Sequence, residues 1–200
     1  MDQATVVKDK IILVGEGNGL HLAIRQAPTK SLGKVIVRPD SADVIQDVEI
    51  EPLTVYPDDR GLFTEVARLG SPGIASPMVA DGQSQIQISA TLTYPGVIKA
   101  IHYHYEQTDL WVPITGMFQV FLCDLRRDSK TFGLINTLYV GHLRPWKILI
   151  PPGVGHGYKV LGVQPAQLIY LTNRFYNPKD EGRLAYDHPD IGYDWETQNK

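Results

Sequence analysis

Two histidines separated by a single residue, His102 and His104, have the type and spacing that most clearly suggest chemistry in this sequence. Side chains at positions i and i+2 of a β-strand project from the same face. If that face lines the interior of a barrel, both imidazoles enter one cavity. A third histidine, His156, follows a Pro-Pro-Gly turn and is expected at the start of another strand. Imidazole titrates near neutral pH and binds transition metals, so this set could transfer protons or hold an ion.

The elements that position these histidines are expected to be short β-strands. Proline (14) and glycine (18) recur along the whole chain and separate short apolar runs. The clearest runs lie at residues 35–37, 85–89, 116–122, 147–150 and 167–171. Residues 85–89 alternate polar and apolar side chains, as a half-buried strand does. Many short strands without a long stretch of helical period predict an all-β sandwich or barrel.

Residues 1–45 differ from the rest, and we expect them to be an extension of added strands ahead of one domain over residues 46–200. Residues 10–14 are β-rich and lead into the glycine-rich segment 15–19. In a dinucleotide-binding G-x-G-x-x-G segment, the third glycine would fall at Leu20, and no clear helix follows. A hairpin turn is therefore favoured over a nucleotide loop.

Composition narrows the class of protein. The chain has 200 residues, of which 43% are hydrophobic and 20% charged, as in a soluble single-domain protein. A net charge of −3 argues against a nucleic-acid partner. No run approaches a membrane span and no secretory signal is visible. Cys123, the single cysteine, cannot form an internal disulfide and is expected to be a small buried residue, so we expect a cytoplasmic protein.

The histidine segments resemble the two sequence motifs of the cupin superfamily. The first, G-x5-H-x-H-x3–4-E-x6-G, is matched by Gly96, His102, His104, Asp109 and Gly116, with aspartate in place of glutamate. The second, P-x-G-x2-H, is matched by Pro151, Gly153 and His156. The resemblance implies a cupin-type β-sandwich or jelly-roll barrel. It leaves two alternatives for the site: a divalent transition metal held by His102, His104, Asp109 and His156, or hydrogen-bonded pocket residues with no ion.

A second resemblance covers more of the chain, over residues 48–195. Seven features in order are similar to the dTDP-4-dehydrorhamnose 3,5-epimerase family. They are residues 58–65 (D-D-R-G-L-F-T-E), Gln87, residues 96–102 (G-V-I-K-A-I-H), 124–133 (D-L-R-R-D-S-K-T-F-G), 150–157 (I-P-P-G-V-G-H-G), 169–170 with 175–178, and 190–195 (D-I-G-Y-D-W). Their shared order makes the resemblance specific, although each is weak alone.

That family removes a proton beside the C4 ketone of a dTDP-4-keto-6-deoxyhexose and returns it on the other face. Such a reaction needs a base, an acid across the sugar ring, and a cation or donor for the enolate. The resemblance implies that His102 is the base and Tyr170 the acid, that no cofactor is required, and that the protein is a homodimer acting on a nucleotide sugar. The implied substrate-binding residues are Arg60, Glu65, Gln87, Lys99, His156 and Tyr176. Arg60 would hold the nucleotide or its diphosphate.

Three departures from the family pattern bear on the mechanism. Counting back from Gly116, the family's catalytic lysine falls at Asp109, and a carboxylate repels an enolate. His104 stands where the family usually has glutamine. The aspartate that orients the family's histidine is expected to be missing, with Asp187 or Asp190 as possible substitutes.

Three functions therefore stay open. The first is a nucleotide-sugar 3- and/or 5-epimerase or isomerase. The second is a metal-dependent cupin enzyme acting on another small molecule, in which the ion replaces the lysine as a Lewis acid. The third is a non-catalytic sugar- or nucleotide-binding relative, suggested by the loss of the lysine and the aspartate.

Overall fold

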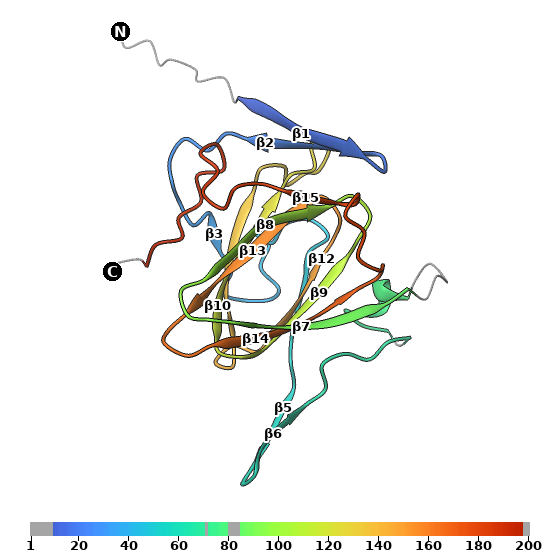
Figure 1. Ribbon diagram of the computed structural model, residues 1–200, viewed down its shortest axis with the longest axis vertical. Coiled ribbons are helices and arrows are strands. Elements are labelled where there is room, and N and C mark those ends of the chain that lie inside the picture. Colours follow the sequence, from blue (N-terminus) through green and yellow to red (C-terminus); the bar gives the residue numbers. More distant parts are fainter. Residues whose placement is uncertain (1–9, 71, 80–84, 198–200) are drawn as a thin grey trace.

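Two β-sheets packed face to face form the body of the protein in a computed structural model, which describes residues 10–70, 72–79 and 85–197 (Figure 1). The six-stranded sheet has the order β15 (Glu181–Arg183), β8 (Ile98–His104), β13 (Val154–Leu161), β10 (Met117–Asp124), β11 (Ile135–Gly141) and β3 (Lys34–Val35). The five-stranded sheet has the order β4 (Glu49–Pro52), β12 (Trp146–Ile150), β9 (Asp109–Thr115), β14 (Ala166–Thr172) and β7 (Gln87–Thr93). All pairings are antiparallel except that of β3 with β11.

The prediction of an all-β, cupin-type fold is confirmed. Each of the five apolar runs singled out above contributes to a strand, namely β3, β7, β10, β12 and β14. The boundaries differ most at β7, which begins at Gln87 and continues to Thr93. Among the described residues the only helix is a short 3₁₀ turn, η1 (Ser76–Met78), and none is long and apolar enough to cross a membrane.

The central core lies between the two sheets and follows from side-chain alternation along the strands. On β10, Phe118, Val120 and Leu122 point inward and pack against Trp111 and Ile148 of the other sheet. The alternate residues of β10 point outward, and Cys123 is one of them. Cys123 is buried as expected, and burial raises the pKa of its thiol to about 12.

A second layer covers the outer face of the six-stranded sheet. Leu22 and Ile24 of β2 (Leu20–Arg25) and the aromatic residues Tyr193 and Trp195 pack onto this face. The ring centroids of Phe121 and Tyr193 lie 4.6 Å apart. Segments from both ends of the described chain therefore hold the sheet that carries the histidines, and a third apolar cluster around η1 covers part of the five-stranded sheet.

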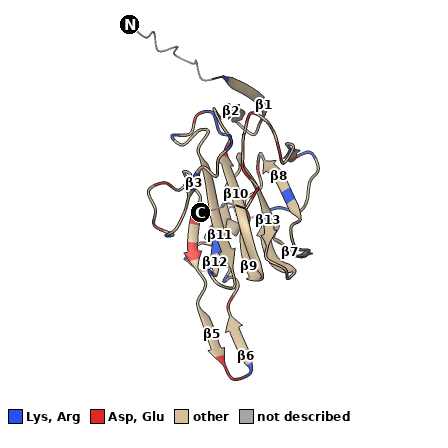
Figure 2. Ribbon diagram, turned by 90° about the vertical axis from the view of Figure 1, so that its left-hand side faces the viewer, with Lys and Arg blue, Asp and Glu red and all other residues tan. Residues whose placement is uncertain are grey.

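Two hairpins extend from this body. The first joins β1 (Ile11–Gly17) to β2 through Asn18 and Gly19, both at positive φ, which confirms the predicted hairpin turn. The second joins β5 (Val55–Asp58) to β6 (Gly61–Thr64) and projects away from the barrel, with charged residues at its tip (Figure 2). Its side chains Tyr56, Leu62 and Phe63 are all more than half exposed.

A buried carboxylate, Asp124, closes the loop between β10 and β11. The side chain is fully buried and accepts hydrogen bonds from Ser129 Oγ and Thr131 Oγ1, each at 2.6 Å. It also accepts one from Arg126 Nε at 2.8 Å, and Arg126 in turn binds Asp47 Oδ2 at 2.9 Å. The family-like segment 124–133 is therefore structural, because its polar residues satisfy one another and tie the N-terminal part of the chain to the sheet.

We predict that Asp124→Ala lowers the free energy of unfolding by about 3 kcal/mol, because it removes the buried carboxylate that accepts hydrogen bonds from Arg126 and from the hydroxyl groups of Ser129 and Thr131. Urea denaturation measures this value. The matched control is Asp128→Ala, four residues away with a side chain that is 81% exposed, which we expect to stay within about 0.5 kcal/mol of wild type. Equal effects of the two substitutions would contradict the structural role of Asp124.

Candidate functional site

A cavity of about 410 Å³ lies between the two sheets and is lined by residues of both. From the six-stranded sheet come Lys99, His102, His104 and His156. From the five-stranded sheet come Gln87, Asp109 and Tyr170, and Tyr176 lies in the loop after β14. Eight of the ten residues singled out from the sequence therefore line one cavity.

A one-residue bulge in β8 explains how Lys99 and His102 both reach this cavity. His102 pairs with His156 of β13, and Lys99 pairs with Tyr158, so three residue steps on β8 oppose two on β13. In a regular strand, residues three apart point to opposite faces, and the extra residue reverses this relation. The strands approach closely here, since a Cβ on Gly157 would lie 2.3 Å from Ala100 Cβ.

Glu181 orients His102. The Nδ1–H group of His102 donates to Glu181 Oε1 at 2.9 Å, and the Glu181 side chain is only 9% exposed. Burial alone would raise the pKa of Glu181, but Arg183 at 2.5 Å and the neighbouring His102 lower it below its usual range. In the neutral imidazole, this hydrogen bond from Nδ1 to the carboxylate places the lone pair on Nε2, which can then accept a proton.

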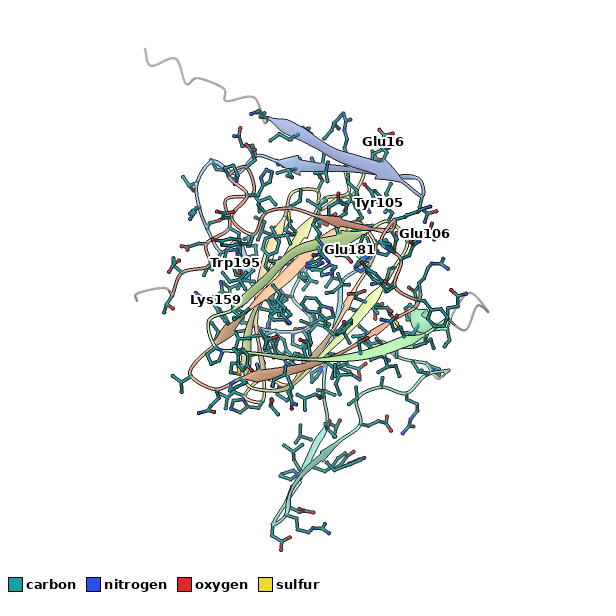
Figure 3. The ribbon with its side chains drawn as sticks, viewed as in Figure 1. Glu16, Tyr105, Glu106, Lys159, Glu181 and Trp195 are labelled. Carbon is teal, nitrogen blue, oxygen red and sulfur yellow. The ribbon has the colours of Figure 1, made fainter. Side chains whose placement is uncertain are left out.

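The prediction that Asp187 or Asp190 could orient His102 was wrong. Asp190 accepts a hydrogen bond from Gln26 Nε2 at 2.7 Å, and neither aspartate lines the cavity. Glu181 lies on β15, which pairs with β8 at the edge of the six-stranded sheet (Figure 3). The pairing of these two strands therefore supplies an orienting carboxylate for His102, which was not predicted from the sequence.

Tyr170 faces the cavity from the opposite sheet. It lies on β14, between Trp111 of β9 and Ser89 of β7, and is half-buried. His102 and Tyr170 thus belong to different walls of one cavity. A molecule bound between them meets an imidazole on one side and a phenol on the other, as a proton transfer across a ring requires.

Three of the four residues predicted as metal ligands come together in the cavity. Donor atoms of His104, Asp109 and His156 lie within 4.8 Å of one another, and all three side chains are buried. Burial raises the pKa of the Asp109 carboxyl, lowers that of His104 and lowers that of His156 to about 4. Two imidazoles and a carboxylate are donors that fit a divalent transition metal.

Hydrogen bonds to neighbouring residues fix the side chains of Lys99 and Gln87 in the cavity wall. Lys99 Nζ donates to Thr91 Oγ1 at 2.9 Å. Gln87 donates through Nε2 to Ser89 Oγ at 3.2 Å and accepts from the backbone N–H of Tyr176 at 3.1 Å. Gln87 therefore ties the loop that carries Tyr176 to the cavity wall.

Arg60 and Glu65 are the two predicted site residues that do not line this cavity. Arg60 sits at the tip of the β5–β6 hairpin, where its guanidinium pairs with Asp58 and its side chain is 83% exposed. Glu65 pairs with Arg68 at 2.8 Å and borders a separate hollow of about 490 Å³ at the base of the hairpin. Within one chain, neither residue lines the cavity that contains His102.

Sequence reasoning missed Glu181, Gln107 and Trp111. Gln107 Nε2 donates to Asp109 Oδ1 at 2.7 Å, and Trp111 Nε1 donates to Asp109 Oδ2 at 3.2 Å. The i+2 spacing of Gln107, Asp109 and Trp111 was a usable signal, since alternate residues entering a strand share a face. Glu181 carried no such signal, because β15 is three residues long.

The fold and the cavity define a cupin-type β-sandwich protein with a histidine-lined site between its sheets. The sequence model of one family, dTDP-4-dehydrorhamnose 3,5-epimerase, matches residues 43–200, and the chain belongs to this family.

Individual relatives agree with this assignment. The spore coat polysaccharide biosynthesis protein SpsL of Bacillus subtilis is 43% identical over 161 residues, which are 78% of this chain and 99% of the relative. The probable low-salt glycan biosynthesis epimerase Agl13 of Haloferax volcanii is 36% identical over 162 residues, covering 77% of this chain and 96% of the relative. The crystal structure of a dTDP sugar isomerase from Desulfovibrio desulfuricans superposes with a TM-score of 0.67 at 25% identity, covering 76% of this chain and 92% of that one.

We predict that Gly182→Ala destabilises β15, the strand that positions Glu181. A Cβ on Gly182 would lie 2.0 Å from Cζ of Tyr103, a buried ring that packs edge-on against Tyr105. Overpacking of this kind costs about 1–3 kcal/mol in the free energy of unfolding, which urea denaturation measures.

The control is the same substitution in a Tyr103→Leu background, which removes the Cζ and hydroxyl atoms. There we expect Gly182→Ala to cost less than about 1 kcal/mol. An equal cost in both backgrounds would show that the ring of Tyr103 is not what excludes a side chain at position 182.

Proposed function

We propose that the protein is a nucleotide-sugar epimerase that inverts the 3- and/or 5-carbon of a dTDP-4-keto-6-deoxyhexose-like substrate in carbohydrate biosynthesis. The observation that carries the proposal is the Glu181-held His102 facing Tyr170 across one cavity. Family membership and the names of the relatives, one an epimerase in glycan biosynthesis and one a polysaccharide biosynthesis protein, support the substrate class.

In the proposed mechanism, His102 Nε2 removes the proton from the carbon beside the ketone. The C–H electron pair moves into the enolate, and the proton stays on the imidazole. Glu181 accepts the Nδ1–H hydrogen bond throughout and stabilises the imidazolium that forms. Tyr170 donates its phenolic proton to the opposite face of the same carbon, which inverts the centre. Proton exchange with water then returns the phenolate and the imidazolium to their starting states, so the cycle needs no cofactor.

The other cavity residues are proposed to bind the substrate. Lys99 supplies positive charge at the wall, although it lacks the bidentate geometry of an arginine. Gln87 and Tyr176 supply hydrogen-bonding groups for the sugar and the phosphates, and His156 lines the same wall. The alternative of a non-catalytic relative rested partly on the missing orienting aspartate. Glu181 provides His102 with an orienting carboxylate, so this argument for a non-catalytic protein no longer applies.

Arg60 and Glu65 are proposed to act in a homodimer, in which the β5–β6 hairpin of one chain reaches the cavity of its partner. The hairpin projects away from its own barrel (Figure 1). It exposes Tyr56, Leu62 and Phe63, apolar side chains suited to a contact. Arg60 at its tip does not line the cavity of its own chain. The division into an extension over 1–45 and a domain over 46–200 and the cytoplasmic location stay predictions from the sequence.

We predict that His102→Gln lowers the rate of solvent deuterium incorporation into dTDP-4-keto-6-deoxyglucose by at least about 10²-fold, because it removes the base. Glu181→Gln should lower kcat by about 10–100-fold with a smaller change in KM, since its role is to position His102. Mass spectrometry of the recovered nucleotide sugar measures both rates.

The control for this pair is Asp190→Asn, which changes a carboxylate that binds Gln26 and does not line the cavity. We expect it to keep the wild-type exchange rate within about twofold. Exchange by His102→Gln at the wild-type rate, with the fold verified by its unfolding midpoint, would remove His102 as the base.

We predict that the hairpin acts in trans. Arg60→Ala alone should lower kcat/KM by about 10–100-fold, the loss expected for a charged hydrogen bond to phosphate. His102→Gln and Arg60→Ala chains, co-expressed with different affinity tags and purified through both, should form a heterodimer with about half the wild-type kcat/KM, because one of its two sites is intact. If Arg60 instead contributed to the cavity of its own chain, the kcat/KM of this heterodimer would be only half that of the Arg60→Ala homodimer.

A further inference from the structure

We propose that His104, Asp109 and His156 bind one divalent transition-metal ion at a site separate from the His102–Glu181 pair. The three side chains come from β8, β9 and β13, so both sheets contribute to the site. Each is at least nine-tenths buried, and their donor atoms lie within 4.8 Å of one another. The proposal goes beyond epimerisation and does not depend on it.

His156 presents a lone pair to this site. Its Nδ1–H donates to the backbone carbonyl of Val154 at 2.9 Å, so Nε2 is the unprotonated nitrogen. Nε2 lies 3.7 Å from Asp109 Oδ2, too far for a hydrogen bond. Atoms that bind one ion at about 2.0–2.2 Å lie roughly 3–4 Å apart, so this separation suits two ligands of a shared ion.

His104 has a carboxylate on the Nδ1 side of its ring. Its Nδ1 is buried without a hydrogen-bond partner, and Asp180 Oδ2 lies 3.7 Å away. A carboxylate behind one ring nitrogen is typical of histidines that bind metal through the other. Its Nε2 contacts Gln107 Nε2 at 3.2 Å, and the same amide reaches Asp109. Rotation of that amide by half a turn would present Oε1 as a further ligand.

Charge also favours an ion at this position. Asp109 is 5% exposed, and no lysine or arginine pairs with it among the residues that the structure describes. A buried carboxylate without a cation is costly, and hydrogen bonds from Gln107 and Trp111 compensate only part of its lost hydration. A divalent ion would supply the missing positive charge.

The structure separates His102 from this set, in contrast to the four-ligand alternative drawn from the sequence. His102 is not in the group whose donor atoms lie within 4.8 Å of one another, and its ring centroid lies 6.5 Å from that of His156, compared with 5.6 Å between His104 and His156. Three protein ligands leave coordination positions open toward the cavity, which is typical of sites where an ion acts as a Lewis acid. An ion here would polarise an oxygen of a bound molecule.

Cobalt titration tests the proposal without any assay of activity. The full-length protein is stripped with a chelator and titrated with Co²⁺, and bound ion is followed by visible absorption and elemental analysis. We expect saturation near one ion per chain, with affinity lowered at least about tenfold in His104→Gln and His156→Gln. His102→Gln should keep the stoichiometry, and so should His21→Gln, a control at a half-exposed histidine outside the cavity.

Asp109→Asn serves as a second test if a histidine variant fails to fold, because it retains the shape of the side chain and should also weaken binding. The absence of saturable binding by the wild-type protein would overturn the proposal. Loss of binding in His102→Gln with retention in His156→Gln would do the same. Deuterium exchange by the metal-stripped protein is a separate result, so failure of the metal site and failure of the epimerase proposal are distinguishable.

Discussion

The alternation of side chains along β8 is the constraint on which the rest of the site depends. Ile101 and Tyr103 point outward into the layer formed with β2 and the C-terminal aromatic residues, and His102 and His104 point inward to the cavity. A one-residue slip of β8 would exchange these faces, burying two imidazoles in an apolar layer. The packing of the outer layer therefore fixes the register that places both histidines in the cavity.

The space between the sheets has an apolar part and a polar part. Around β10 it is filled by apolar side chains, which stabilise the fold by burial. Around β8 and β9 it contains buried polar groups, whose loss of hydration has to be offset by mutual hydrogen bonds or by an ion. Gln107, with contacts to both His104 and Asp109, shows how closely these groups depend on each other. The apolar part thus provides the stability that permits the polar part to remain open to a ligand.

Local rules explain what could be predicted from the sequence. The two-residue period placed His102 and His104 on one face, and the Pro-Gly turn placed His156 near them, because both signals lie within a few residues. Glu181 could not be predicted, since it reaches His102 only through the pairing of a three-residue strand with β8. The bulge that turns Lys99 inward arises from the pairing of β8 with β13, so it could not be predicted from the sequence of either strand alone. The position of Arg60 depends on where a hairpin extends beyond the barrel, which sequence similarity alone does not specify.

Asp109 places a buried carboxyl group, and not a cation, in the wall of the cavity. Glu181 is compensated by Arg183 and His102, whereas Asp109 has polar donors and His156 nearby but no lysine or arginine partner among the described residues. Lys99 is the remaining cationic residue on the wall, and it lies exposed beside Thr91, away from the buried cluster. A substrate bearing a diphosphate would add further negative charge to a cavity with little positive charge of its own. The two proposals above would each add positive charge for such a substrate: an arginine carried by the projecting hairpin of a partner chain, and an ion held by the buried cluster.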